Sequence, residues 1–270
     1  MVGDVRQILR RALDERDYRE LLFDDFERAV DGLALDRRER ETIRALSWPD
    51  FEQDAAELLA RLPAPIRAGR RLLIAPDFEP LAAGPEDVVV RMPPRPGAAF
   101  GLHDSTRSCL AAMEDHLRPG DRLLDLGAGG GILAIAGVGL GASGALGLDI
   151  NPAAVETARE NARLNEMSDR VRVEYGSLTD VGSLGLPDPT FDLVVANVLP
   201  HVLLTFIRAG LTARLRPGGR LIVAGMQLAQ MLSIAGVTPI AGLEEIDRYD
   251  SGQWPALVLR RQDNPDTSPA

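Results

Sequence analysis

The sequence of 270 residues contains no lysine, because all 30 of its basic residues are arginine. This absence excludes any mechanism that needs a Schiff base or a general base on a lysine of the chain. The single cysteine, Cys109, excludes an internal disulfide. The three histidines, His103, His116 and His201, have no spacing with one another or with Cys109 that is typical of a metal site. We therefore expect neither disulfides nor a bound metal.

Long apolar segments are also scarce. One stretch, 131–148, has no charge over 18 residues, but six of them are glycine. Glycine weakens helices, so we interpret this stretch as a buried helix, a turn and a buried strand and not as a membrane span. Residues 1–11 are charged where a signal peptide would be apolar, which predicts a cytoplasmic protein.

The chain has an excess of negative charge, with 40 acidic against 30 basic residues and a net charge of −10. This balance argues against a nucleic-acid partner, including DNA, that is held by phosphate neutralisation. Hydrophobic residues make up 45% and charged residues 26% of the chain, as in soluble globular proteins. The oligomeric state does not follow from these numbers.

Residues 1–62 are predicted to be helical. Their apolar residues recur at helical spacing and indicate three or four amphipathic helices, and Ser47 before Trp48 and Pro49 indicates a helix start. Residues 1–60 hold 16 acidic and 10 basic residues, so much of the negative charge is here. We expect a solvated helical region that packs on the main domain, with recognition of a substrate or partner, or a role as a lid, as its function.

Residues 63–106 are expected to form a connector with short strands at 71–75 and 88–91, a stiff proline-rich segment at 92–97 and a loop at 100–106 that covers the cofactor. From 107 to 262, strand-like and helical segments alternate. This pattern predicts an α/β fold with a doubly wound sheet of seven strands, of which those in the alternating part are parallel. The runs 243–249 and 256–260 are close enough to pair as a hairpin, which would place an antiparallel strand at one edge. Residues 263–270 are expected to be disordered.

A glycine loop follows the first strand of this domain. Asp125, Gly127, Ala128 and Gly129 belong to a D-x-G-x-G-x-G pattern, with Ile132 where a dinucleotide-binding loop would need glycine. Glycines let backbone amides approach a ligand at a helix N-terminus. An acid at the end of the strand would repel a pyrophosphate but suits the cationic methionine end of S-adenosylmethionine, directly or through water.

The next two strands end in polar residues that fit the same cofactor. Asp149, followed by Ile150, ends the second strand, and its carboxylate is suited to accept both ribose hydroxyls, although NAD enzymes use the same arrangement. Ser177 follows the third strand, where it would lie near the adenine or would merely cap a turn. Together with the glycine loop, these residues predict an S-adenosylmethionine site whose product is S-adenosylhomocysteine.

Two candidate catalytic residues follow the fourth strand. Asn197 is expected at the carboxyl end of the strand beside the glycine-loop strand, where its carbonyl is placed to hydrogen-bond a substrate amine and aim the lone pair at the methyl carbon. His201 is close enough to line the cleft as a proton acceptor. The alternatives are a capping role for Asn197 and an ordinary polar residue at a helix start for His201.

From Arg71 to Arg261 the chain resembles the bacterial ribosomal-protein methyltransferase family, PrmA. The resemblance includes the segment 96–101 with His103, Ser105 and Thr106, the glycine loop 125–136, Asp149, the segment 194–199, the segment 215–225 and Trp254 to Arg260. It implies the fold of the class I methyltransferases and transfer of methyl groups from S-adenosylmethionine to lysine side chains and an N-terminal amine of a ribosomal protein. It also implies that Phe100, His103 and Thr106 position the cofactor or the substrate, which makes Thr106 a third catalytic candidate and Asn197 a candidate for cofactor binding as well.

The chain differs from this family in two regions. The loop between Phe100 and His103 is two residues shorter, and residues 1–62 are predicted to be helical where the family has a ferredoxin-like domain that recruits the substrate. The function favoured is therefore methylation of an amino group of a protein or peptide, with a ribosomal protein as one possible acceptor. The alternatives are a methyltransferase of small molecules or natural products, with the N-terminal helices as a lid, and an inactive scaffold that binds S-adenosylmethionine.

Overall fold

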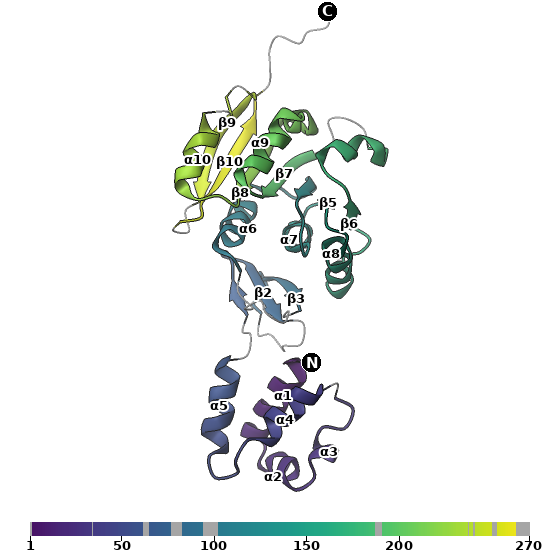
Figure 1. Cartoon of the computed structure of the whole chain (residues 1–270), viewed down its shortest axis with the longest axis vertical. Helices are drawn as coiled ribbons and strands as arrows, with labels where there is room; N and C mark the ends of the chain where they lie inside the picture. The colour runs from purple at the N-terminus through teal and green to yellow at the C-terminus, as the bar shows by residue number, and fades with distance from the viewer. Residues whose placement is uncertain are drawn as a thin grey trace, which may run out of the picture. The chain divides into compact units, whose positions relative to one another are not determined.

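The computed structural model describes residues 2–33, 35–61, 65–76, 83–93, 102–186, 191–236, 238–239, 241–249 and 253–262 (Figure 1). The chain forms two compact units. One contains Met1–Pro65, Ala75–Ala82 and Met92–Gly101, and the other contains Ile66–Ile74, Ala83–Arg91 and Leu102–Ala270. Phe100, most of the proline-rich segment and the tail expected to be disordered lie outside the described residues.

The N-terminal unit is helical, as predicted. Within the described residues it contains five helices, more than the three or four expected, because Asp25 ends one helix and its side chain caps the next by accepting from the Arg28 amide. Their apolar faces share a core that includes Ile8, Leu9 and Phe51, each at most 1% exposed. The helices are α1 (Val2–Asp14), α2 (Arg16–Asp24), α3 (Phe26–Ala29), α4 (Arg37–Arg44) and α5 (Phe51–Arg61).

A three-stranded sheet contains the two strands expected in the connector. Its order is β1-β2-β3, and β1 pairs antiparallel with β2. The strands are β1 (Ile66–Arg67), β2 (Leu72–Pro76) and β3 (Val88–Met92). The backbone of Arg91 exchanges hydrogen bonds of 2.7 and 2.8 Å with the side chain of Asn165, which attaches β3 to the end of helix α8 (Pro152–Leu164).

The larger unit has the predicted seven-stranded sheet, in the order β6-β5-β4-β7-β8-β10-β9. Strands β6, β5, β4, β7 and β8 are mutually parallel. The order reverses at β4, between β5 and β7, and ligands of such sheets bind at the carboxyl ends of the strands at this kind of switch point. The strands are β4 (Arg122–Leu126), β5 (Gly144–Asp149), β6 (Val171–Tyr175), β7 (Phe191–Asn197), β8 (Leu215–Ala224), β9 (Leu243–Tyr249) and β10 (Ala256–Arg261).

The predicted hairpin of β9 and β10 is confirmed, since the two strands pair antiparallel. β10 also pairs antiparallel with β8, so it is inserted between β8 and the outermost strand β9. Because β10 runs against the parallel strands, its first residues lie at the carboxyl edge of the sheet. This reversal brings Trp254, just before β10, to the same edge as the glycine loop.

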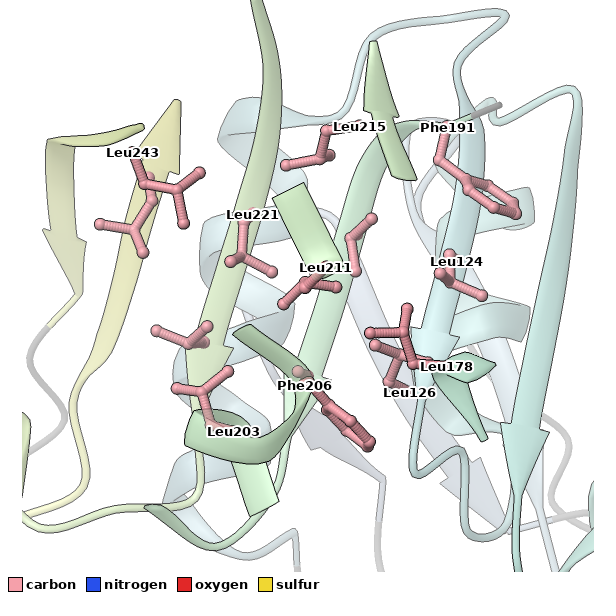
Figure 2. Packing of buried hydrophobic residues seen from close by; sticks show 14 of the residues in the cluster. Leu124, Leu126, Leu178, Phe191, Leu203, Phe206, Leu211, Leu215, Leu221 and Leu243 are labelled. Carbon is pink, nitrogen blue, oxygen red and sulfur yellow. The ribbon is translucent and has the colours of Figure 1, made fainter. Parts of the chain in front are cut away.

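Helices cover both faces of this sheet. α6 (Asp104–His116), α7 (Ile132–Gly139) and α8 contact the strands on one face. On the other face, leucines at alternate positions of the strands, including Leu124, Leu126 and Leu221, pack against Leu203 and Phe206 of α9 (Pro200–Arg208) and against α10 (Leu228–Ala235) (Figure 2). The period of two in the strands therefore sends Leu124 and Leu126 to one face and Asp125 to the other. No helix in the described residues is long and apolar enough to cross a membrane.

Candidate active site

Glycines shape the carboxyl edge of the sheet between β4 and β7. Gly127, Gly129 and Gly131 have φ angles of 77°, 53° and 78°, in the left-handed region that favours glycine. A Cβ atom on Gly127 would lie 2.8 Å from a methyl group of Val198, so a side chain at this position would displace its neighbour. Because these three residues have no side chain, the loop backbone is open to a ligand. The loop ends where α7 begins.

A cavity of about 650 Å³ opens at this edge. Its volume is in the range of small-molecule and cofactor sites, about 300–1,000 Å³. Seven of the predicted site residues line it: His103, Gly127, Asp149, Ile150, Ser177, Asn197 and His201. The remaining lining residues are Leu126, Leu148, Gly176, Val198, Leu199, Val202, Thr205, Phe206, Gly225 and Trp254.

Asp149 joins the end of β5 to the glycine loop. Its Oδ2 accepts a 2.8 Å hydrogen bond from the Gly129 amide, and its Oδ1 accepts one of 2.8 Å from the Asn151 amide. A carboxylate has about four acceptor sites, so Asp149 keeps capacity for further donors in the cavity. The two amides orient the carboxylate before any ligand arrives.

Asp125 lies outside the cavity lining and is fully buried on the face covered by α6 and α7. Its Oδ2 accepts from the Ala134 amide at 3.2 Å, at the start of α7, whereas its Oδ1 has no partner in the described structure. The pKa of this carboxyl is raised to about 7, chiefly because of its burial. The hydrogen bond from the Ala134 amide lowers the pKa, and the negative charge of Asp149 raises it further. A cationic ligand beside the loop would favour the ionised form.

We expect Asp125→Asn to make the protein more stable at pH 8. The folded-state pKa lies above the ordinary value of 3.8, so the native state binds more protons than the unfolded state between pH 4 and 7. Wild-type stability therefore falls as pH rises through this window, and the variant lacks this loss. The new amide N–H₂ lacks an acceptor, which offsets part of this gain in the free energy of unfolding. The net gain at pH 8 should be about 1–3 kcal/mol. Urea midpoints measured at pH 5 and pH 8 test this, and an equal pH dependence in both proteins would contradict it.

Asn197 stands at the end of β7, next to β4 in the sheet, as predicted. Its Nδ2 donates a 3.1 Å hydrogen bond to Oγ1 of Thr106 on α6. Because the amide nitrogen is held by Thr106, the amide carbonyl oxygen is the group left to accept from a substrate. Thr106 does not line the cavity itself. Its position fits a residue that acts through Asn197.

His103 and Trp254 form one wall of the cavity. Their rings pack edge to face with centroids 4.6 Å apart, and the Trp254 carbonyl accepts from the Ser108 hydroxyl at 2.8 Å. His103 also caps α6, accepting from the Ser105 amide through Nδ1. Trp254 was not among the predicted site residues, because site residues of such sheets are expected at the carboxyl ends of parallel strands and Trp254 precedes an antiparallel one. The resemblance of the segment 254–260 was the signal that pointed to it.

Some of the other predicted residues lie at the cavity and others lie away from it. Ile150 is 72% exposed in the cavity wall, and Ser177 precedes η1 (Leu178–Leu184) at the cavity edge, where its backbone amide donates to the Asp180 carboxylate at 2.8 Å. His201, at the start of α9, also lines the cavity. Ala128 is nearly buried and donates its amide to the Leu148 carbonyl. Phe100 lies outside the described residues. Within the described ranges, no three His, Cys, Asp or Glu side chains gather as metal ligands.

The site fits S-adenosylmethionine. The oriented carboxylate of Asp149 would suit the two ribose hydroxyls, the exposed apolar side chain of Ile150 would suit the adenine, and Gly127 has no side chain to keep a ligand from the backbone. The buried carboxyl group of Asp125, whose Oδ1 has no hydrogen-bond partner in the described structure, would be ionised more readily beside a cationic ligand. A doubly wound sheet with an antiparallel hairpin and this site defines a class I methyltransferase that uses S-adenosylmethionine.

Comparison with known proteins identifies the family. A family model described as "Ribosomal protein L11 methyltransferase (PrmA)" matches residues 26–262, and the chain belongs to this family. The ribosomal protein L11 methyltransferase of Chloroflexus aurantiacus is 37% identical over 229 residues, covering 78% of this chain and 70% of the relative. That of Pelobacter propionicus is 38% identical, covering 85% and 72%.

A solved structure agrees with this assignment. The crystal structure of the ribosomal protein L11 methylase from Lactobacillus delbrueckii subsp. bulgaricus superposes with a TM-score of 0.65 at 29% identity, covering 74% of this chain and 98% of that one. The match covers a smaller share of the curated relatives than of this solved structure. In the relatives compared, this chain spans between 58% and 72% of the relative's length.

Proposed function

We propose that the protein transfers methyl groups from S-adenosylmethionine to amino groups of ribosomal protein L11. The observation that carries this proposal is the Asn197 amide, which lines the cavity with its nitrogen held by Thr106 and its carbonyl oxygen available. The relatives are named for methylation of L11, which supplies the acceptor. Since this acceptor is ribosomal, we place the reaction in the cytoplasm.

The residues of the chain act mainly by alignment. The cofactor supplies an activated methyl group, so the protein must hold the acceptor nitrogen in line with it and exclude competing water. The Asn197 carbonyl oxygen accepts one N–H of the amine and so sets the direction of its lone pair. His103 and Trp254 form an adjoining wall that limits where the acceptor side chain lies.

The acceptor amine must lose a proton before it attacks. Bringing a lysine from a pKa of about 10.4 to the neutral form at pH 7 costs roughly 4.6 kcal/mol, which the site must supply or avoid. Most of the cavity lining is apolar, and desolvation there disfavours the charged amine. His201 lies in the same lining, and we assign it the role of taking the proton or passing it to water.

We expect Thr106→Val to lower kcat about tenfold while leaving the Kd of S-adenosylhomocysteine unchanged. Valine keeps the shape of threonine but removes the oxygen that holds the Asn197 nitrogen, so the amide is free to rotate. Thr106→Ser keeps the hydroxyl and should keep most of the activity. Steady-state kinetics and calorimetry on the three proteins test this. Equal rates for the valine and serine variants would show that the hydrogen bond does not position Asn197.

The direct test of the function is transfer of a radiolabelled methyl group to purified L11 from the same organism. Label that appears on lysine or on the N-terminal amine of L11, located by mass spectrometry of peptides, supports the proposal. Label recovered only in small extractable metabolites would favour a small-molecule methyltransferase. If the protein binds S-adenosylhomocysteine but transfers no methyl group to L11 or to any component of a cell extract, the result would favour an inactive scaffold.

A further inference from the structure

Two aromatic side chains of the N-terminal unit are exposed and touch each other. Trp48, between α4 and α5, is 45% exposed, and Phe23 of α2 is 36% exposed. Their rings pack edge to face with centroids 5.0 Å apart, and Phe23 packs in the same manner on the buried Phe51 at 5.7 Å. Isolated exposed apolar residues are normal on protein surfaces. In the described part of this unit, Phe23 and Trp48 are the two large hydrophobic residues that are exposed, and they contact each other to form one patch.

The buried residue Phe51 and a hydrogen-bonded turn support the two aromatic side chains. Phe51 is 1% exposed and belongs to the core of the unit, so Phe23 and Trp48 rest on a fixed base. The Ser47 hydroxyl accepts from the Asp50 amide and donates to the Asp50 carboxylate, which fixes the turn that carries Trp48. A rigid aromatic surface loses little conformational entropy when a partner covers it, and tryptophan is enriched among residues that dominate binding energy.

Acidic residues close in sequence to the two aromatic residues lack cationic partners in the described structure. Asp24 follows Phe23 and Asp50 follows Trp48 by two residues, and both are exposed and form no ion pair in the described structure. Arg19, whose guanidinium lies over the Phe51 ring, is already paired with Glu52 at 3.1 Å. Residues 1–60 have six more acidic than basic residues. The surface therefore suits a partner with positive charge next to apolar side chains.

We propose that Phe23, Trp48, Asp24 and Asp50 form a docking surface for a positively charged segment of the acceptor protein L11. An arginine or lysine of that segment stacks on the Trp48 ring while its charge lies near the two carboxylates. Docking there raises the local concentration of acceptor amines without taking part in the chemistry. This inference rests on the proposed function, since it names the surface by which the same enzyme binds its substrate.

The test compares kinetics with purified L11 and with a short lysine peptide cut from it. For Trp48→Ala and Asp24→Arg we expect the KM for L11 to rise five- to tenfold, with kcat, the KM for the peptide and the Kd of S-adenosylhomocysteine unchanged. Leu228→Ala is the control for Trp48→Ala, since Leu228 is also 45% exposed but belongs to α10 of the other unit. Asp169→Arg is the charge-matched control, on a 76% exposed side chain of that unit. Circular dichroism checks that each variant folds.

Calorimetry of L11 binding, without cofactor, separates this inference from the proposed function. Methylation of L11 with a binding affinity that neither variant changes would overturn the docking surface and leave the function standing. Binding that is weakened by both variants, without methylation, would support the surface and overturn the function. Absence of both binding and methylation would overturn both. Weakening by the control variants to the same extent would also count against the surface.

Discussion

Replacing Asn197 by alanine should reduce kcat roughly 100-fold or more while the Kd of S-adenosylhomocysteine stays within about twofold of wild type. The alanine variant lacks the carbonyl oxygen that accepts from the acceptor amine, so the nitrogen lone pair is no longer directed at the methyl carbon. Because we assign cofactor binding chiefly to Asp149 and the glycine loop, the substitution should spare it. Single-turnover rates of methyl transfer to L11 and calorimetry with S-adenosylhomocysteine measure the two quantities.

Thr106→Val is the matched comparison for this prediction, because it removes the hydrogen bond that orients Asn197 but not the Asn197 oxygen itself. The alanine variant should therefore be the slower of the two. An unchanged rate for Asn197→Ala would remove this residue from the active site. A loss of S-adenosylhomocysteine affinity as large as the loss of rate would instead assign Asn197 to cofactor binding.

Asp149→Ala should weaken S-adenosylhomocysteine binding at least about 100-fold. A hydrogen bond to a charged group contributes about 1.5–3 kcal/mol, and the carboxylate is placed to accept two ribose hydroxyls. The substitution also releases the Gly129 amide, whose 2.8 Å hydrogen bond holds the glycine loop to β5. Isothermal calorimetry of both proteins measures the difference directly.

Asp149→Asn separates these two contributions. Asparagine keeps an oxygen that accepts from the Gly129 amide but loses the charge and half of the acceptor capacity, so its affinity should lie between those of wild type and the alanine variant. Equal affinity of all three proteins for S-adenosylhomocysteine would refute the ribose role. Tighter binding of NAD than of S-adenosylhomocysteine to wild type would show that the glycine loop was misinterpreted.

Most of the fold was accessible from the sequence because its signals are local. Asn151 and Pro152 start α8 as predicted, with the Asn151 side chain accepting from the Ala153 amide at 3.0 Å. The alternation of apolar strands with helical segments predicted a parallel sheet, since parallel strands need crossover connections. The division of the N-terminal helices at Asp25 was not foreseen, because a capping aspartate inside an amphipathic pattern resembles a solvated residue of one longer helix.

The candidate site was predicted in part, and what was missed depended on contacts between distant residues. Asp149 and Asn197 end β5 and β7, the two strands on either side of β4, so their meeting at one edge follows from the strand order of a doubly wound sheet. Thr106 meets Asn197 across 91 positions of the chain, and the sequence alone did not indicate that its hydroxyl holds the amide. Trp254 reaches the cavity because β10 is inserted antiparallel between β8 and β9.

The class of fold, the glycine loop and the order of the polar residues that end the strands follow from local sequence, because periodicity and backbone conformation are properties of short segments. The burial of Asp125 behind the loop, its raised pKa and the contact between Phe23 and Trp48 became visible in the folded structure alone. Burial and side-chain contact depend on which faces of separate elements pack together, and no short segment contains that information.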